Sequence, residues 1–359
     1  MAIAASGAVS FGDLRTEFVG GSGAISYSDL YRGGSNIRAK AANNTGVNLA
    51  ASVPTSGIIN FTNFRGQAKG FRFTYTTEST DQDADTLFGS DYAVDYPKEI
   101  LINSGVTIGG VSDDALDIPS TLAGTLVINN NGSIIGKGGT ANGGAGGHAI
   151  NNAASNVTIN NAGSLLAGGG GGGKGGNGGG GRYSTTSNQY QGTSAGKGWD
   201  FSDGGCMNLS RCGSFTQSYQ VGQKGTQVCR CKFGNSSFRS GTHTCQYNDD
   251  AYYSAKCYRS VTSNTNTSGG TGGNGGRGQG YNQTLASGSG GGSGGQNAGN
   301  GGSGQSGAAY GQSASNGNTG ANGNRTNGSG GAGGGAAGAA VLGTSVTMNN
   351  TGTLAGSVA

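Results

Sequence analysis

The sequence predicts a mostly irregular and β protein, built on a lattice of extended polyglycine-II chains with small β caps. Two further parts are expected: an N-terminal module of short repeats and a disulfide-rich loop domain inserted between two glycine runs. Three observations predict this fold. Glycine accounts for 80 of the 359 residues and recurs with a period of three, apolar strand-like segments bracket the glycine runs, and all six cysteines fall within one interruption.

The clearest triplet run, at residues 269–280, reads GGT-GGN-GGR-GQG. The same period appears at 172–180 and, less regularly, at 138–147 and 328–338. A period of three fits neither a helix nor a strand, but it matches the three-residue turn of the polyproline-II conformation. Ordering glycine costs about 1–2 kcal/mol of backbone entropy per residue. Such chains are therefore stable only if neighbouring chains pair their N–H and C=O groups.

Close packing of these chains requires glycine at the facing positions, so the third residue of each triplet is expected to point outward. These third residues are Lys174, Asn177, Thr271, Asn274 and Arg277. The alternative is a flexible Gly/Ser linker. The triplet register and the bracketing apolar segments favour the lattice. Collagen is excluded, because the chain has only 3 prolines and no unbroken repeat.

The overall composition excludes several classes of function. The formal charge of +4 is too small to indicate nucleic-acid binding, and no segment approaches the roughly 20 apolar residues of a membrane helix. The first residues, MAIAASGAVSF, lack the basic and apolar regions of a signal peptide. Only two histidines are present. We expect no cofactor, no catalytic residue, no metal, no nucleic-acid partner and no membrane insertion.

Residues 1–70 contain one motif three times, starting at Ser6, Ser22 and Ser56. Each copy has Ser-Gly, two apolar residues, a polar residue and an aromatic one, followed by a turn with Asp or Asn. This pattern predicts a very short strand and a capped helical turn, with Ser28 or Thr62 as possible N-caps. One copy is too small to fold alone. We interpret residues 1–70 as an attachment module; a purely structural cap is the alternative.

Residues 71–130 form a predicted β-rich connecting region. The segment FRFTYTT from Phe71 alternates with period two and predicts a strand. The run Asp81–Asp85 resembles the start of a calcium loop, but Thr86 replaces the required Gly and Tyr92 replaces the required Glu. We expect a solvated acidic loop there.

Residues 131–359 form the predicted polyglycine-II sandwich. A second repeat flanks its glycine runs, and some copies lie just before residue 131. Its copies start at Thr125, Val157 and Val346, and a looser copy starts at Ile100. Each copy has a β-type triplet, an Asn-rich turn and a short apolar strand. The turns end in Gly132, Gly163 and Gly352, and Asn and Gly are expected to supply a positive φ. The repeat predicts a small β-layer that caps the lattice.

The inserted segment 182–267 has a different character. Residues 182–260 hold 12 of the 26 aromatic residues and nine Lys or Arg against four Asp. The cysteines are Cys206, Cys212, Cys229, Cys231, Cys245 and Cys257. Clustered cysteines in a small polar segment favour a disulfide framework. Zinc bound by Cys229, Cys231, His243 and Cys245, and free thiols, are the alternatives.

A basic, aromatic and cross-linked module on a rigid scaffold is typical of a recognition surface, because aromatic rings stack on sugars and cations pair with phosphates or carboxylates. Aromatic residues that only form a small core are the alternative. The candidate receptor-binding residues are Tyr190, Trp199, Phe201, Arg211, Tyr219, Arg230, Lys232, Arg239, Tyr247, Tyr252, Tyr253, Tyr281 and Tyr310.

The glycine runs, the repeat ending in Asn-Asn-X-Gly and the terminal VTMNNTGTLAGSVA together resemble the polyglycine-sandwich adhesins at the tips of T-even-like phage long tail fibres. The resemblance covers about residues 100–359, and the repeats of residues 1–70 resemble short repeats in other phage tail and fibre proteins. Two features depart from the family: the insertion is larger than its usual loops, and the attachment region looks different.

The resemblance implies a sandwich of polyglycine-II helices whose distal loops set the host receptor. It implies a non-enzymatic adhesin on the virion, outside the cell. Residues 1–70 would bind other tail or fibre proteins, and the insertion would bind a host surface glycan or outer-membrane protein. Separately from the resemblance, disulfides in a chain that shows no signal peptide could form after release from a lysed cell.

Three other functions are weighed. The chain could be a structural tail or capsid-decoration protein with only protein contacts. A polysaccharide depolymerase would need paired carboxylates in a groove, and the sequence offers no convincing pair. An ice-binding protein is disfavoured by the basic, aromatic insertion.

Overall fold

The computed structural model describes residues 3–20, 24–112, 114–197, 215–216, 227–233, 241–248, 252–343 and 345–359, with side chains left out for 188–260. The chain forms two compact units. The first comprises Met1–Gly180 and Ser268–Ala359, and the second comprises Gly181–Thr267. In the described residues, no helix is long and apolar enough to cross a membrane.

Each copy of the N-terminal motif forms a helical turn, as predicted, but the described residues before each turn do not form the very short strand that was also predicted. These turns are α1 (Phe11–Leu14, continued by η1, Arg15–Val19), η2 (Tyr27–Leu30) and η3 (Phe61–Phe64). Their last residues, Leu14, Leu30 and Phe64, are fully buried together with Ile37 and Val53 in a small core. The three copies therefore fold by sharing one core.

The predicted N-caps Ser28 and Thr62 are wrong by two residues. Ser26 and Asn60 cap η2 and η3, because the capping residue must be extended just before the turn and face a partner three residues on. In η2 the partner is Asp29, whose carboxylate accepts from the Ser26 N–H at 2.8 Å.

Residues 71–166 and 341–355 build three parallel sheets that the chain visits in turn. The long sheet contains β1 (Val47–Asn48), β2 (Phe71–Tyr75), β5 (Lys98–Ile102), β8 (Leu126–Asn130), β11 (Val157–Asn161) and β19 (Val346–Asn350). The second sheet contains β3 (Ser79–Thr80), β6 (Thr107–Gly109), β9 (Ser133–Ile135), β12 (Ser164–Leu166) and β20 (Thr353–Ala355). The third contains β4 (Gln82–Asp83), β7 (Leu116–Ile118), β10 (Ile150–Asn152) and β18 (Val341–Leu342).

Only the β1–β2 pair is antiparallel among the strands of these three sheets. One strand from each sheet, in chain order, makes one coil, so the chain winds as a stack of coils with three sides. We call this part the coil stack. It confirms the predicted strand of Phe71 and the strands of the second repeat. The third side of the stack was not foreseen.

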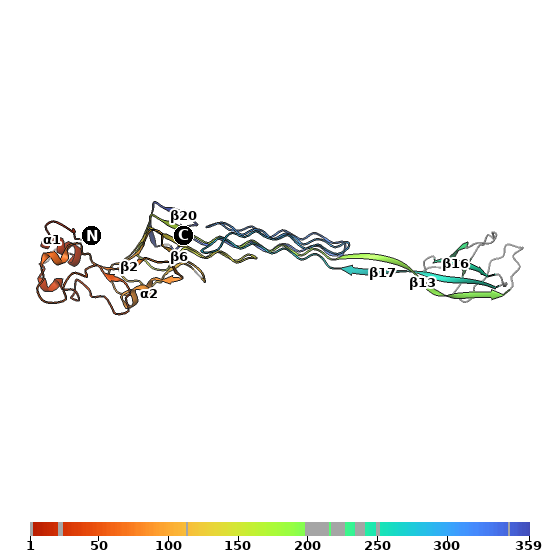
Figure 1. Cartoon of the computed structure of the whole chain (residues 1–359), viewed down its shortest axis with the longest axis horizontal. Coiled ribbons are helices and arrows are strands. Elements are labelled where there is room, and N and C mark those ends of the chain that lie inside the picture. The colour runs from red at the N-terminus through yellow and green to blue at the C-terminus, as the bar shows by residue number, and fades with distance from the viewer. Residues whose placement is uncertain are drawn as a thin grey trace. The chain divides into compact units, whose positions relative to one another are not determined.

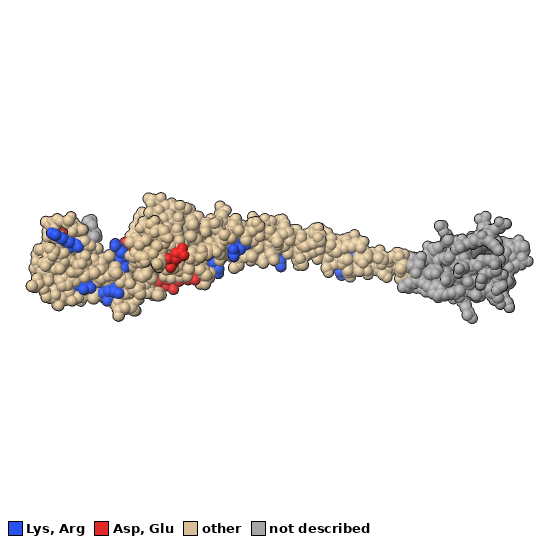
Figure 2. Space-filling view, in the orientation of Figure 1, with Lys and Arg blue, Asp and Glu red and all other residues tan. Residues whose placement is uncertain are grey.

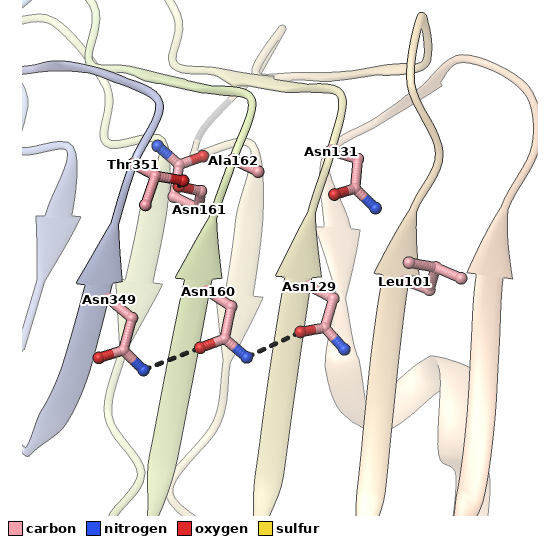
Figure 3. A pocket seen from close by; sticks show the side chains of 8 residues that line it. All are labelled: Leu101, Asn129, Asn131, Asn160, Asn161, Ala162, Asn349 and Thr351. Atoms are coloured by element: carbon pink, nitrogen blue, oxygen red, sulfur yellow. Dashed lines mark hydrogen bonds between the residues drawn. The ribbon is translucent and has the colours of Figure 1, made fainter.

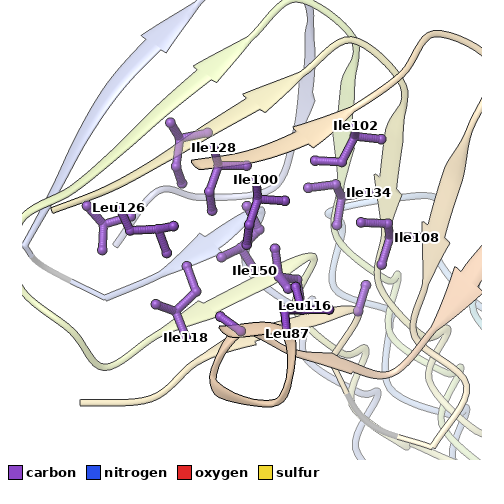
Figure 4. Packing of buried hydrophobic residues seen from close by; sticks show 14 of the residues in the cluster. Leu87, Ile100, Ile102, Ile108, Leu116, Ile118, Leu126, Ile128, Ile134 and Ile150 are labelled. Carbon is purple, nitrogen blue, oxygen red and sulfur yellow. The ribbon is translucent and has the colours of Figure 1, made fainter. Parts of the chain in front are cut away.

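Apolar side chains fill the coil stack from all three sides (Figure 4). Equivalent positions of successive coils lie in register, as in the row formed by Ile100, Ile128 and Ile159, all fully buried. Ile134 from the second sheet and Ile150 from the third complete the same core. Side-chain burial of this kind contributes roughly 1.5–3 kcal/mol per large apolar residue.

The turn glycines of the second repeat are required for a reason other than the predicted positive φ. Gly132, Gly163 and Gly352 are absent from the residues with positive φ. A Cβ on Gly163 would lie 1.9 Å from the Gly132 carbonyl oxygen, and one on Gly352 would lie 2.1 Å from that of Gly163. The coils stack too closely at this corner for any side chain, so that prediction is corrected.

The predicted acidic loop is also corrected. Residues 84–88 form the short helix α2 (Ala84–Phe88), followed by η4 (Gly89–Asp91), and Phe88 is fully buried. Asp81 has a positive φ of 48°, and its carboxylate accepts from the backbone N–H of Val111 at 2.7 Å. Apolar residues between the carboxylates pack on the coil stack, which an acidic-loop interpretation overlooked.

The glycine-rich segments are insertions between strands of two coils. Residues 136–149 join β9 to β10 as a short hairpin, and residues 167–340 join β12 to β18. Within unit 1, the long insertion makes six extended runs that lie side by side (Figure 1). In chain order, we number them run 1 (167–180), run 2 (268–281), run 3 (283–296), run 4 (298–310), run 5 (312–324) and run 6 (326–340).

Run 1 is hydrogen-bonded with a period of three. The N–H groups of Gly172, Gly175 and Gly178 donate to run 2 carbonyls, each at 2.8 Å. The N–H groups one residue further on, those of Gly173, Gly176 and Gly179, donate to run 5 at 2.8–3.0 Å. Carbonyl groups of run 1 accept from runs 4 and 6. Run 1 therefore pairs with chains on several sides, which a strand in a sheet cannot do.

The glycines of the runs have no room for a side chain. A Cβ on Gly172 would lie 1.9 Å from the Gln305 carbonyl oxygen, and one on Gly275 would lie 1.8 Å from that of Gly172. The third residues of the triplets, such as Lys174 and Arg277, are exposed, as predicted, whereas glycines beside them are buried. The structure thus confirms the requirement for glycine at facing positions.

Candidate functional site

Unit 2 is an antiparallel sheet in its described residues. β13 (Gly181–Lys197) pairs with β17 (Tyr252–Thr267), with a register shift between Tyr190 and Gly192. The strand order continues through β16 (Gly241–Asn248), β15 (Gln227–Phe233) and β14 (Phe215–Thr216). An inserted loop domain was predicted; the described part of the insertion is instead built from strands.

Polar side chains form hydrogen bonds between the two strands at the start of the β13–β17 ribbon. The Arg182 guanidinium donates to Asn266 at 3.1 Å, and the Ser184 hydroxyl donates to Asn264 at 2.6 Å. Residues 184–188 and 262–267 are all Ser, Thr or Asn, which suits a two-stranded ribbon exposed on both faces. Along the chain, the ribbon follows run 1 after Gly180 and leads into run 2 at Ser268.

Several predicted receptor-binding residues fall on these strands. Tyr190 lies in β13, Tyr247 in β16, and Tyr252 and Tyr253 in β17. Tyr247 is opposite Tyr253 in the backbone register, and Tyr252 is opposite both Asn248 and Lys197. The remaining strand candidates, Arg230 and Lys232, lie in β15; Trp199, Phe201, Arg211, Tyr219 and Arg239 lie outside the described residues.

Four of the six cysteines lie on described strands. Cys229 and Cys231 are in β15, Cys245 is in β16 and Cys257 is in β17. Cys229 is opposite His243 in the register of β15 and β16. Cys206 and Cys212 lie outside the described residues. Outside residues 188–260, whose side chains are left out, the described residues contain no group of three or more His, Cys, Asp or Glu that could hold a metal ion.

Tyr281 and Tyr310 are placed where the glycine runs meet the coil stack. The Tyr281 ring lies over Gly109, where an added Cβ would come within 2.1 Å of it, and the Tyr281 N–H donates to Gly136 at 3.1 Å. Tyr310 is half-buried, and burial raises the pKa of its hydroxyl. These contacts give both tyrosines a packing role at the ends of runs 2 and 4.

Two polar turns at the other ends of the runs were missed by the sequence analysis. Asn297, with a positive φ of 59°, lies between runs 3 and 4, and its carbonyl accepts from the N–H of Asn324, the last residue of run 5, at 3.0 Å. The Arg325 N–H donates to Gly180 at 3.1 Å. The sequence signal was present: each turn interrupts the glycine runs with consecutive polar residues, Gln296–Asn297 and Asn324–Arg325.

A groove of about 380 Å³ lies on the outer face of the long sheet. A ladder of amides crosses it: Asn349 donates to Asn160 at 2.9 Å, and Asn160 donates to Asn129 at 2.8 Å (Figure 3). The ladder continues from Asn129 to Glu99 at 2.7 Å. These amides form hydrogen bonds to one another. The ladder therefore contributes to the register of the coils rather than to binding a ligand.

A second groove, of about 480 Å³, lies beside α2 and η4 and contains Asp85 and Tyr92. Asp85 is the only carboxylate on its lining, and the amide groove has none. Within the described residues, neither groove therefore brings together the two carboxylates that glycoside hydrolysis requires.

Charged groups are sparse along the glycine runs. Figure 2 shows a mostly uncharged surface there on the face in view, with isolated Lys and Arg, and acidic side chains over the coil stack. The runs offer backbone and small polar groups in a rigid array. Aromatic and basic residues are concentrated instead in the sequence of the inserted unit.

The chain thus contains two compact units, one with the coil stack and the glycine runs and one with the inserted sheet. The family model of the phage tail fibre adhesin Gp38 matches residues 70–266, more than half of the chain. The chain belongs to this family of phage tail fibre adhesins, which confirms the resemblance found in the sequence. The family places it on the tail fibre of a virion.

No curated protein matches the chain. Among solved structures, the chain is similar to one in the crystal structure of the gp37–gp38 adhesin tip complex of the bacteriophage S16 long tail fibre. The identity is 19%, covering 85% of this chain and 88% of that chain, with a TM-score of 0.33. This similarity is too low to carry a structural argument.

Proposed function

We propose that this tail fibre adhesin binds a host surface receptor through residues 182–267, without catalysis. The glycine runs act as a rigid support, and residues 1–70 attach the chain to another tail or fibre protein. The receptor would be a host glycan or an outer-membrane protein. One observation carries the proposal. The inward-facing positions of the runs are glycines that pack backbone against backbone, while aromatic and basic residues are concentrated in the insertion.

We further propose that runs 1–6 are polyglycine-II helices packed as a sandwich. The period-three hydrogen bonds of run 1 to runs 2 and 5 support this assignment, because a three-residue turn directs successive N–H groups to different neighbours. A side chain on a facing position would collide with a carbonyl oxygen. Such a support has few internal degrees of freedom and holds an inserted module by both of its ends.

The six cysteines would cross-link the inserted module as disulfides. The segment is small and rich in polar residues, so cross-links would reduce the entropy of its unfolded state. Residues of the insertion suited to receptor contact include Tyr247, Tyr253 and Arg230, which lie on neighbouring strands. Aromatic residues and arginine commonly dominate binding energy at protein surfaces.

Competition for adsorption tests the proposal. Purified chain is added to host cells before the phage that encodes it, and the fraction of adsorbed phage is measured. A second chain has residues 186–262 replaced by Asn-Gly, which closes the register pair Thr185–Ser263 with a two-residue turn. The full chain should block adsorption and the shortened chain should not. Equal blocking by both would contradict a receptor site in the insertion.

Charge reversal provides a matched control. The double variant Arg230→Glu and Lys232→Glu should lose blocking if basic residues of the module contact the receptor. Lys174→Glu and Arg277→Glu, on exposed positions of runs 1 and 2, should keep it. The same samples incubated with host polysaccharide test the depolymerase alternative, since a fall in polymer length would establish catalysis.

A further inference from the structure

The two ends of the coil stack differ in how their strands are covered. At the first coil, β1 pairs with the outer edge of β2, and Phe71 in β2 is fully buried. At the last coil, β19 and β20 are the edge strands of their sheets, and no strand of the described residues pairs with their outer edges. Only the third side is covered, by residues 357–359, since the Ala359 N–H donates to the Val341 carbonyl at 3.0 Å. We call the outer edges of β19, β20 and residues 357–359 the open end.

The apolar core reaches the surface at the open end. Ile159 and Leu165, in the preceding coil, are fully buried. Their register partners in the last coil are Met348, which is half-buried, and Leu354, which is 38% exposed. Val358, which pairs with β18, is 44% exposed. Positions that are core in one coil are therefore partly in water in the next, and covering them would contribute favourable free energy.

Two rows of amides in the long sheet also stop at the open end. In the outer row, Asn349 donates through Nδ2 to Asn160 at 2.9 Å, so its Oδ1 ends the row. In the inner row, Asn350 accepts through Oδ1 from Asn161 at 2.6 Å, so its Nδ2 ends the row. Both terminal side chains are exposed. The open end thus offers an acceptor and a donor side by side, and an uncharged polar edge can pair with both.

The sequence of the last coil lacks the features that usually keep edge strands from pairing. Such strands commonly carry Lys, Pro or a bulge. Residues 341–359 contain no Asp, Glu, Lys, Arg or Pro, and β19 keeps one register against β11 along all of its length. The open end is therefore neutral, partly apolar and bordered by amides. Two copies of it can meet without charge repulsion, which favours a second copy of this chain over a charged partner.

We propose that two copies of this chain pair through their open ends about a twofold axis perpendicular to the long sheet. The axis sets β19 antiparallel to β19 of the partner subunit, and it exchanges the second and third sides of the stack. β20 therefore meets residues 357–359 of the partner subunit, which brings Leu354 beside the partner's Val358. Such a contact closes at two copies, and β1 prevents a head-to-tail array because it occupies the edge of the long sheet at the first coil. The pairing is independent of the proposed receptor function.

Sedimentation equilibrium of the purified full chain tests the pairing. Over concentrations from about 0.1 to 100 μM, the mass should rise from one chain to two and then stop. Electrophoresis without reductant identifies any dimer made by disulfides of the insertion, which does not count as this pairing. A chain that stays monomeric over the whole range, or that grows into larger assemblies, would overturn the proposal.

A charge on the edge strand tests where the two copies meet. Thr347 is exposed on β19 between Val346 and Met348, which pack on the core. Thr347→Lys therefore leaves the core unchanged and brings two cations together across the axis. We expect the dissociation constant of the dimer to rise at least about ten-fold. Thr121→Lys, at an exposed threonine between β7 and β8, is the matched control and should dimerise as the original chain does. Equal dimerisation of the two lysine variants would contradict the proposal.

Leu354→Ser provides a second variant should Thr347→Lys fold poorly. It removes the apolar side chain that meets the partner's Val358, twice in each dimer, and should weaken dimerisation roughly ten- to hundred-fold. Amide hydrogen exchange of the original chain reports on the same edge, because N–H groups of β19 and β20 should exchange more slowly in the dimer than in the monomer. A dimer in which these groups exchange as in the monomer, or protection of β19 only after another virion protein is added, would overturn the pairing of two copies.

Discussion

The coil stack and the glycine runs are stabilised in opposite ways. Both hold extended chains side by side, and both belong to one unit of the molecule. The coil stack buries side chains such as Ile128, while run 1 buries backbone at positions such as Gly172. Apolar burial stabilises the first. The second depends on the completeness of its hydrogen bonds and on the absence of a Cβ at the facing positions, so those positions tolerate change much less.

Adding one methyl group to the lattice should produce the largest effect. A Cβ in Gly172→Ala would lie 1.9 Å from the Gln305 carbonyl oxygen, within a run that is bonded on several sides. We expect a loss of about 4 kcal/mol in unfolding free energy, or no folding. Gly290→Ala is the control, since nothing lies within 4 Å of its Cβ. Calorimetric melting of both variants measures the difference; similar melting would contradict backbone packing.

Removing side-chain volume from the coil stack should have the next largest effect. Ile128→Ala leaves a cavity among fully buried neighbours such as Ile100 and Ile159, and should reduce the unfolding free energy by about 3 kcal/mol. Leu285→Ala, at a leucine that is 48% exposed, should change it by less than about 0.5 kcal/mol. Urea unfolding checks both values, and an Ile128→Ala chain as stable as the original would show that the core is not packed as described.

The buried and half-buried amides of the long sheet provide a finer test. Asn161 is 1% exposed, accepts from Asn130 at 2.7 Å and donates to Asn350 at 2.6 Å. Asn161→Ala removes both of these hydrogen bonds from a buried position and should cost about 2 kcal/mol. Asn160→Ala, at its half-buried neighbour in sequence, should cost about 0.5 kcal/mol. Equal losses of stability for Asn161→Ala and Asn160→Ala in thermal unfolding would contradict this difference between the two positions.

The smallest effect concerns the junction between the N-terminal module and the coil stack. Burial acts to raise the pKa of Asp91, but hydrogen bonds from Ala41 and Asn44 and the Arg38 guanidinium outweigh it and hold the pKa below its usual range. A lowered pKa gives stability that is present above about pH 4 and is lost as the pH falls below it. Asp91→Asn should cost about 1–2 kcal/mol at pH 7 and less at pH 3.

Melting temperatures across pH 3–7 check this prediction. Asp95→Asn, at an exposed aspartate nearby, is the control and should follow the original chain. A pH dependence in the Asp91→Asn chain that equals that of the original chain would show that another carboxylate is responsible.

The sequence predicted the parts of the fold that follow from local rules. Glycine triplets with outward residues such as Lys174, the strand at Phe71 and the capped turns of the N-terminal repeats all follow from period and steric size. The third side of the coil stack does not. Its strands have two or three residues each, and 174 residues separate β12 from β18, so no periodicity connects them.

The site was predictable only in part, for physical reasons. Composition singled out the insertion, because aromatic and basic residues are concentrated there. Register pairs such as Tyr247 with Tyr253 depend on long-range strand pairing, which local sequence does not specify. Tyr281 and Tyr310 were grouped with the recognition residues because their loops were expected to lie near the insertion, and this stays a prediction. The contact of Tyr281 with Gly109 and the hydrogen bond of Tyr310 to Gly280 depend on chain pairing that local sequence does not specify.

The central claim is that the glycine runs are an ordered support that does not need the module they carry. Amide hydrogen exchange of residues 167–180 tests it most directly, in the chain whose residues 186–262 are replaced by Asn-Gly. The account predicts slow exchange for this run, equal to that in the full chain, because its N–H groups pair with runs 2 and 5. Exchange at the rate of an unfolded glycine-rich linker would contradict the account.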